Sequence, residues 1–198
     1  QNLMKCVRRA GLEPDEVVSA GIAAGDAVLA DTEREMGVVL VDIGAGTTDV
    51  AVFIDGTVWH TVTLGIGGAY ITQDIAIGLR LPPAVAEEVK VKHGHAIPEQ
   101  VGSEEVFTVD SFGDELRQEV PRWKLACIIQ ARAEEILSMV NEAIESSGYD
   151  GLLPAGVVLS GGTAQRTATP CATTSSFKRP SSCSSAAAGP GSPGRPRG

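Results

Sequence analysis

The residues best suited to chemistry lie in one octapeptide, Asp42-Ile43-Gly44-Ala45-Gly46-Thr47-Thr48-Asp49, which follows a run of apolar residues. Gly44 and Gly46 have no Cβ, so the backbone around Ala45 can approach a bulky group closely. Successive amide N–H groups in such a turn attract an anion, and the hydroxyls of Thr47 and Thr48 add further donors. The octapeptide therefore predicts a phosphate-binding hairpin.

Asp42 stands at the end of the apolar run, where it would face the same anion. Because a carboxylate and a phosphate repel each other, Asp42 beside a polyphosphate needs an intervening Mg²⁺, usually bound through coordinated water. In that position Asp42 could also orient an attacking water, so it is both the catalytic and the metal-site candidate. The alternative is that Asp42 caps a turn and that the glycines only close a β-hairpin.

A second glycine turn, Ser160-Gly161-Gly162-Thr163, follows the apolar residues 157–159. Gly161, Gly162 and Thr163 are small enough for an adenosine to lie against their backbone. An ordinary strand–turn–helix junction would look the same. A phosphate hairpin followed about a hundred residues later by such a turn nevertheless indicates ATP as the ligand.

These turns need a scaffold of strands and helices. Aromatic residues make up only 4% of the chain, so aliphatic side chains must build the core, which favours an α/β fold. We expect strands at 38–43, 49–54 and 58–64, with Asp55-Gly56 as a type I′ turn between the last two. Before them we predict a strand at 17–22 and a short helix at 24–29.

Helical spacing of apolar residues predicts the elements that follow. Ile71, Ile75 and Leu79 share one face of an expected helix at 69–79. We expect a second helix at 84–93 and a short edge strand at 106–109. A long helical pattern then runs from 114 to 146, where Pro121 either divides the helix or marks its start and Gly148 ends it.

Charge and cysteine content exclude several classes of protein. The first 165 residues carry 25 acidic and 11 basic side chains, a surface that repels nucleic-acid phosphates, so no nucleic-acid partner is expected. The four cysteines are scattered without C-x-x-C spacing, which is typical of reduced cytoplasmic thiols. No apolar run approaches the roughly 20 residues that cross a bilayer.

Both ends of the sequence look like those of a fragment. Gln1 opens directly into an amphipathic helical pattern, so we expect further sequence upstream. Residues 166–198 contain no acidic residue and one aromatic residue, and we expect them to be disordered because they cannot bury enough apolar area. The abrupt change at residue 166 suggests a reading-frame shift, with a genuine basic linker as the alternative.

The two glycine turns resemble those of the actin, Hsp70 and sugar-kinase superfamily. Within it, the sequence is most similar to the FtsA family of bacterial cell-division proteins, through residues 30–37, 74–76, 86–94, 140–142 and 155–165. The resemblance implies an α/β fold: half of an actin-like (RNase H-like) ATPase domain with an inserted α+β lid-like subdomain.

The same resemblance implies a division of the chain and further site residues. Residues 1–30 would end an FtsA-specific subdomain and cross over from it, 31–80 and 152–165 would form the ATPase subdomain, and 81–151 the lid-like subdomain. ATP and Mg²⁺ are the implied cofactors. In the family the hairpin faces the phosphates, Lys90 lies beside the ribose with Glu87 as a second candidate, and Gly161–Thr163 contact the adenosine.

The resemblance implies a scaffold protein that is at most a weak ATPase. Members of the family tether FtsZ filaments to the inner face of the cytoplasmic membrane and help to assemble the division septum. They also self-associate into filaments. The resemblance implies that the FtsZ C-terminal tail docks on the lid-like subdomain, where Arg132 could pair with its acidic groups. A solvated helix arginine is the alternative. Membrane contact would need a C-terminal amphipathic helix, for which 166–198 has no apolar face.

Other chemistry has less support in the sequence. A kinase of the same superfamily that phosphorylates a small molecule would share this cleft, and it remains the alternative function. His93 and His95 supply two possible zinc ligands with no third nearby, which is too few. Cys127 has no histidine near it in sequence, so we assign no nucleophile.

Overall fold

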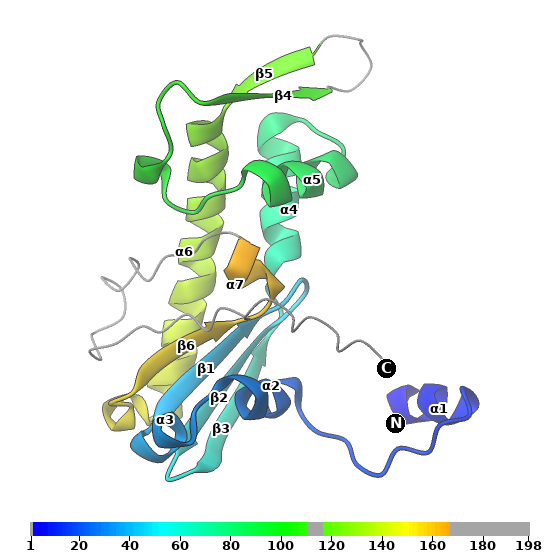
Figure 1. Cartoon of the computed structure of the whole chain (residues 1–198), viewed down its shortest axis with the longest axis vertical. Coiled ribbons are helices and arrows are strands. Elements are labelled where there is room, and N and C mark those ends of the chain that lie inside the picture. The colour runs from blue at the N-terminus through cyan, green and yellow to red at the C-terminus, as the bar shows by residue number, and fades with distance from the viewer. Residues whose placement is uncertain (1, 111–116, 167–198) are drawn as a thin grey trace, which may run out of the picture.

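An apolar strand, β1 (Val38–Ile43), is central in a four-stranded sheet in the computed structural model, which describes residues 2–110 and 117–166 (Figure 1). The strand order is β3-β2-β1-β6, and β1 pairs antiparallel with β2 (Thr48–Ile54) and parallel with β6 (Gly156–Ser160). β3 (Thr57–Leu64) pairs antiparallel with β2. Val38, Val39, Leu40 and Val41 are all 0% exposed, as expected for a strand that is covered on both faces.

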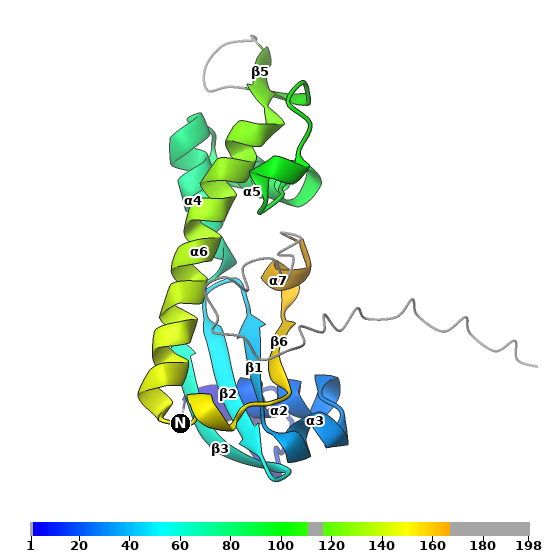
Figure 2. The same cartoon turned by 90° about the vertical axis from the view of Figure 1, so that its left-hand side faces the viewer.

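Helices cover the two faces of the sheet (Figure 2). The long helix α6 (Arg122–Ser147) lies along one face, and α2 (Ala20–Val28) with α3 (Asp31–Met36) lies along the other. The approach of α2 is close because it presents glycine. A Cβ on Gly25 would stand 2.2 Å from the ring of Phe53, so no larger residue fits without displacing that ring.

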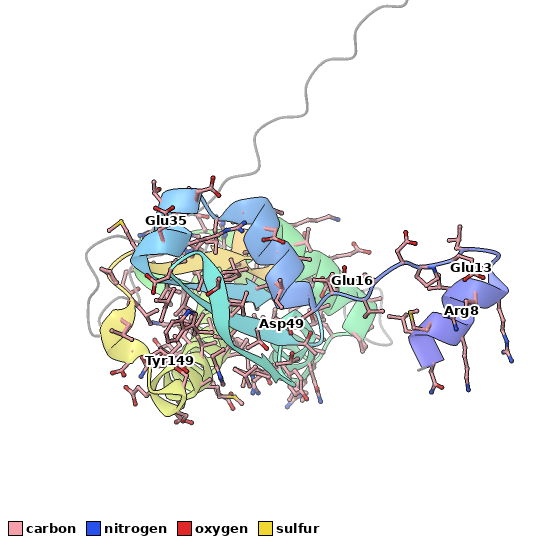
Figure 3. The ribbon with its side chains drawn as sticks, turned by 90° about the horizontal axis from the view of Figure 1, so that it is seen from below. Arg8, Glu13, Glu16, Glu35, Asp49 and Tyr149 are labelled. Atoms are coloured by element: carbon pink, nitrogen blue, oxygen red, sulfur yellow. The ribbon has the colours of Figure 1, made fainter. Side chains whose placement is uncertain are left out.

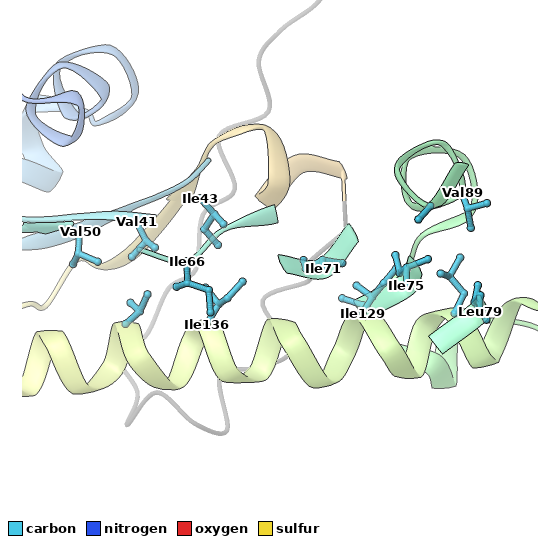
Figure 4. Packing of buried hydrophobic residues seen from close by; sticks show 14 of the residues in the cluster. Val41, Ile43, Val50, Ile66, Ile71, Ile75, Leu79, Val89, Ile129 and Ile136 are labelled. Carbon is cyan, nitrogen blue, oxygen red and sulfur yellow. The ribbon is translucent and has the colours of Figure 1, made fainter. Parts of the chain in front are cut away.

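Above the sheet, α4 (Gly68–Leu79) leads away from the end of β3. Residues 81–121, which we call the lid, contain α5 (Pro83–His93), the short helix η1 (Pro98–Gln100) and a hairpin of β4 (Val106–Asp110) and β5 (Arg117–Pro121). From the lid, α6 returns to the sheet, and η2 (Asp150–Leu152) precedes β6. One apolar core runs along α6 from beneath the sheet to the lid, joining Val50, Ile136, Ile71, Ile129 and Val89 (Figure 4).

The first helix, α1 (Asn2–Arg9), lies apart from the sheet and buries none of its residues, as Figure 3 shows for the segment that carries Arg8 and Glu13. The last described element is the short helix α7 (Gly162–Arg166). The predictions of disorder and of a frame shift for 166–198 concern residues that, after Arg166, lie outside the described part. Within the described ranges, no helix is both long and apolar enough to cross a membrane.

Most sequence-based expectations are confirmed within a residue or two, including β1, β2, β3, α4, α5, β4 and β6. The Asp55-Gly56 turn has positive φ angles of 50° and 73°, as a type I′ turn requires. Gly148 ends α6 with a φ of 76°. These features are local in sequence, which is why periodicity and turn chemistry suffice to predict them.

Two expectations are wrong. The predicted strand at 17–22 does not form; Val17 and Val18 are exposed, and α2 already begins at Ala20. The long helix does not begin near 114, because 117–121 form β5, which hydrogen-bonds to β4. Pro121 precedes α6 as its N-cap, so the alternative that Pro121 marks the helix start is the correct one.

Candidate nucleotide-binding site

The predicted phosphate hairpin is the tight turn between β1 and β2. The Gly44 N–H donates to the Thr47 carbonyl oxygen at 2.9 Å, which closes the turn, while Ala45, Gly46 and Thr47 are exposed. No atom lies within 4 Å of the point where a Cβ on Gly46 would stand. The tip of the hairpin is therefore open to a ligand.

A second glycine segment, Gly65–Gly68, packs against this hairpin at the start of α4. The Gly68 N–H donates to the Gly44 carbonyl oxygen at 2.9 Å, and the Ala69 N–H donates to that of Ala45 at 2.8 Å. A Cβ on Gly67 would lie 2.7 Å from the Gly44 oxygen, so only glycine fits there. From the sequence we predicted only that a helix follows this segment, at 69–79. The two adjacent glycines, Gly67 and Gly68, were the available signal of close packing.

Thr48 is fully buried, and its hydroxyl donates to the Ile66 carbonyl oxygen at 2.8 Å. A hydroxyl has one hydrogen, so in this arrangement the Thr48 side chain supports the Gly65–Gly68 segment and has no hydrogen left for a phosphate. Thr47, next to it, is exposed at the hairpin tip. Of the two predicted hydroxyl donors, only Thr47 therefore faces solvent.

The predicted adenosine turn reaches the same place because β6 runs parallel to β1, with Ser160 opposite Asp42. Gly161 has a φ of +94°, and a Cβ there would stand 2.4 Å from the Ile43 carbonyl oxygen and 2.5 Å from Asp42 Oδ1. The Thr163 hydroxyl donates to the Gly44 carbonyl oxygen at 3.0 Å. Three glycine turns from distant parts of the chain thus meet at Gly44.

A cleft of about 770 Å³ opens beside this meeting point, within the range of ligand pockets. It brings together five predicted residues: Ala45, Glu87, Lys90, Gly162 and Thr163. The other residues predicted for the nucleotide site are not among those that line the cleft: Asp42, Gly44, Gly46, Thr47, Thr48 and Gly161. The sequence missed the lining residues on α4 and at the start of α5: Ala69, Thr72, Gln73, Ala76, Ile77 and Pro83.

Lys90 and Glu87 reach the cleft from α5. Lys90 is only 6% exposed, and its ammonium contacts Glu87 Oε2 at 2.6 Å, the Thr72 hydroxyl at 2.7 Å and the Gly68 carbonyl oxygen at 3.1 Å. The Thr72 hydroxyl also bonds to the Glu87 carboxylate. Half of the Glu87 side chain is exposed, so its carboxylate is held at the cleft surface while Lys90 lies behind it.

Asp42 lies directly opposite Asp49 across the β1–β2 ladder. Burial, and secondarily the charge of Asp49, raises the pKa of Asp42 above its ordinary value. A cation beside the pair would relieve both effects, and this half-buried carboxyl next to the open hairpin fits a Mg²⁺ held through water. Since residues 2–110 and 117–166 contain no cluster of three His, Cys, Asp or Glu, phosphate and water oxygens would supply the other ligands.

Arg132 belongs to α6 and is not among the residues that line the cleft. Its guanidinium makes a two-point ion pair with Asp74 of α4, at 2.6 and 3.0 Å, and contacts Glu135 at 2.5 Å. Hydrogen bonding to Asp74, together with the charges of Asp74 and Glu135, raises the pKa of Arg132 further. The Tyr70 ring lies 5.8 Å from the guanidinium carbon. Arg132 is therefore a tie between α4 and α6 rather than a freely solvated arginine.

The two discounted histidines have structural contacts, whereas the discounted cysteine is exposed. The His93 ring stacks on Phe107 with 4.6 Å between the ring centres, and burial lowers the pKa of His93. His95 Nδ1 contacts the backbone of Ile97. Cys127 is an exposed free thiol.

Comparison with known proteins shows a family for this chain. The family model described as cell division protein FtsA matches residues 39–191. FtsA of Pseudomonas aeruginosa is 43% identical over 165 residues, which cover 83% of this chain and 40% of that protein. FtsA of Bacillus subtilis is 43% identical over 163 residues, covering 82% of this chain and 37% of that protein. The chain thus spans about two fifths of the length of these relatives, and nothing in the match favours a small-molecule kinase.

Solved structures show the same fold in other actin-like proteins. MreB5 of Spiroplasma citri bound to ADP superposes with a TM-score of 0.77 at 20% identity, covering 94% of this chain and 59% of that one. The PilM-PilN type IV pilus biogenesis complex gives a TM-score of 0.64 at 18% identity, covering 92% of this chain and 46% of that one. The expected α/β, actin-like fold is therefore confirmed.

Proposed function

Because this chain belongs to the FtsA family of cell-division proteins, we propose that it forms one wall of the ATP site of an actin-like division scaffold. The observation that carries the proposal is the meeting of three glycine turns at Gly44, whose carbonyl oxygen accepts hydrogen bonds from Gly68 and Thr163 at the edge of the cleft. Such an assembly leaves backbone, rather than side chains, to face a ligand, which suits a phosphate chain.

The geometry supports one orientation of the nucleotide. The open tip at Ala45–Thr47 would take the phosphates, and Gly162 and Thr163 would lie against the adenosine. The Glu87 carboxylate, fixed from behind by Lys90, could accept hydrogen bonds from the sugar hydroxyls. Mg²⁺, when bound, would neutralise phosphate charge, and Asp42 would accept hydrogen bonds from its coordinated water.

The nucleotide proposal is tested by binding of ATP to the 198-residue chain and to Gly46→Ala. Since no atom lies within 4 Å of the added methyl and the φ of Gly46 is not positive, the fold should tolerate it, whereas a phosphate approaching the backbone would collide with it. We expect ATP affinity to fall about tenfold or more, which corresponds to a loss of at least about 1.4 kcal/mol of binding free energy.

Gly65→Ala is the matched control, because it adds the same methyl to open space in the neighbouring turn. It should bind ATP as the unchanged chain does. Equal affinity of the Gly46 and Gly65 variants, or no ATP binding by the unchanged chain, would contradict the proposal. Calorimetry at matched Mg²⁺ concentration measures all three proteins.

We further propose that the division scaffold to which this chain belongs tethers FtsZ filaments to the inner face of the cytoplasmic membrane at the division site and self-associates there. The FtsZ C-terminal tail would dock on the α4–α6 surface, where Tyr70 is 41% exposed beside Arg132. Because Asp74 and Glu135 already occupy the Arg132 guanidinium, an acidic tail would have to compete with them.

That competition makes Arg132→Glu a poor test, since it would also place a carboxylate against Asp74 and separate α4 from α6. Tyr70→Ala removes an exposed ring and leaves the ion pair intact. Its control is Trp123→Ala, because Trp123 is 47% exposed in the first turn of α6. We expect a labelled FtsZ C-terminal peptide to lose affinity for the Tyr70 variant alone. Equal loss in both variants, or in neither, would rule out this docking surface.

A further inference from the structure

Lys90 is the only charged residue among the described residues that is buried. Its ammonium carries three N–H groups, and the structure provides three acceptors for them, on Glu87, Thr72 and Gly68. All its hydrogens are thus engaged within the protein. Lys90 has no donor left for a sugar hydroxyl, although the family resemblance would place it beside the ribose.

Gly68 links this buried ammonium to the phosphate hairpin. Its carbonyl oxygen accepts from Lys90 at 3.1 Å, and its N–H donates to the Gly44 carbonyl oxygen at 2.9 Å. The Thr163 hydroxyl bonds to the same Gly44 oxygen. Hydrogen bonds therefore run without a break from the hairpin and the adenosine turn, through one residue, to helix α5 of the lid.

The link has little freedom to stretch. A Cβ on Gly68 would stand 2.3 Å from the Thr163 hydroxyl oxygen, so the residue is held closely between α7 and the hairpin. If Gly68 moved away from Lys90, the ammonium would lose an acceptor where only 8% of its side chain is exposed to water. Leaving a buried charge short of partners is strongly unfavourable, so α5 is expected to follow any displacement of Gly68.

We propose that Lys90 is a positioning residue that ties the lid to the phosphate hairpin through Gly68, so that a nucleotide at the hairpin fixes the position of α5. This inference rests on the proposed ATP site and concerns its regulation. Lys90 and Glu87 both line the cleft, but the Lys90 side chain is buried and the Glu87 side chain is half-exposed. We therefore assign to Lys90 the coupling between the nucleotide site and α5, and leave contact with the ligand to Glu87.

The test is hydrogen exchange of the α5 amides, residues 84–93, with and without saturating Mg²⁺-ATP. Lys90→Met keeps the aliphatic length and removes the ammonium. Lys92→Met is its matched control, because Lys92 lies on the same helix and pairs with Glu88 at 3.3 Å but is 65% exposed. We expect ATP to slow α5 exchange about tenfold in the unchanged chain and in the Lys92 variant, and less than about twofold in the Lys90 variant.

ATP affinity separates positioning from direct contact, so it is measured on the same three proteins. A Lys90 variant that binds ATP within about tenfold of the unchanged chain, yet no longer protects α5, supports the inference. Protection of α5 by ATP that is unchanged in this variant overturns it. So does an affinity loss of about a hundredfold or more with full protection of α5 at saturation, because Lys90 would then act on the ligand itself.

Thr72→Val provides a second variant should Lys90→Met not fold, since it leaves the Lys90–Glu87 ion pair in place and removes one acceptor beside Gly68. Its α5 protection by ATP should fall between those of the other two proteins, and protection equal to that of the unchanged chain argues against the link. Absence of ATP binding by the unchanged chain would refute the proposed ATP site, whereas binding without this transmission refutes the inference alone.

Discussion

Replacement of Gly161 by alanine should open the sheet at the edge of the cleft, whereas the same replacement at Gly162 should not. At Gly161 the new methyl would stand 2.4 Å from the Ile43 carbonyl oxygen and 2.5 Å from Asp42 Oδ1, and φ is +94°. At Gly162 no atom lies within 4 Å, and φ is not positive. The two positions are adjacent and carry the same residue, so the difference between the variants reports the combined cost of the left-handed backbone and of the close packing at Gly161.

The magnitude follows from two costs at Gly161. A left-handed conformation costs an L-residue about 1–2 kcal/mol, and overpacking against backbone adds about 1–3 kcal/mol. Alanine returns about 0.4–1 kcal/mol by restricting the unfolded chain. We therefore expect Gly161→Ala to lower the free energy of unfolding by about 1–4.5 kcal/mol, and Gly162→Ala to leave it unchanged or raise it by up to about 1 kcal/mol.

Urea denaturation followed by circular dichroism measures both free energies, provided that the denaturant slopes agree. A difference of less than about 1 kcal/mol between the two variants would refute the reasoning, because the clash and the strain would then be absent or relieved by a small backbone shift. Loss of ATP binding by a folded Gly161 variant would in addition place the damage at the Asp42 end of β1.

Two further predictions concern the charged residues Asp42 and Arg132. Because burial and Asp49 raise the pKa of Asp42 in the folded chain above 3.8, ionisation of Asp42 lowers stability as pH rises through the folded pKa. In the absence of Mg²⁺-ATP, Asp42→Asn should therefore melt at a higher temperature than the unchanged chain at pH 7, with the gap closing as pH falls toward 3.8; a constant gap would contradict this. Arg132→Met breaks the two-point, partly exposed ion pair with Asp74 that joins α4 to α6, and it should lower the free energy of unfolding by about 1–2 kcal/mol. Lys92→Met, which breaks the exposed ion pair with Glu88, should lower it by about 0.3–0.5 kcal/mol. Urea denaturation compares them, and equal losses would mean that the Arg132 tie adds nothing beyond a surface pair.

Local signals in the sequence predicted most helices and strands. They failed where the conformation of a segment depends on another segment packed against it. Gly148 and the Asp55-Gly56 turn were readable because positive φ restricts residue choice. Residues 117–121 were not, since a segment with a helical pattern becomes a strand when β4 lies alongside to satisfy its backbone. Val17 and Val18 have strand-forming side chains, yet both lie exposed ahead of α2.

The tight turn at residues 44–47 and the glycine turn after β6 can be recognised from the residue types, because few residues allow bare backbone at a tight turn. How the two turns are arranged depends on contacts that are distant in sequence. Parallel pairing of β6 with β1 brings Gly161 and Thr163 to Gly44 over more than a hundred residues, and the packing of α5 on α4 buries the Lys90 ammonium against Gly68. Which hydroxyl or ammonium still has a hydrogen to donate depends on its neighbours in space, and residue type alone does not specify them.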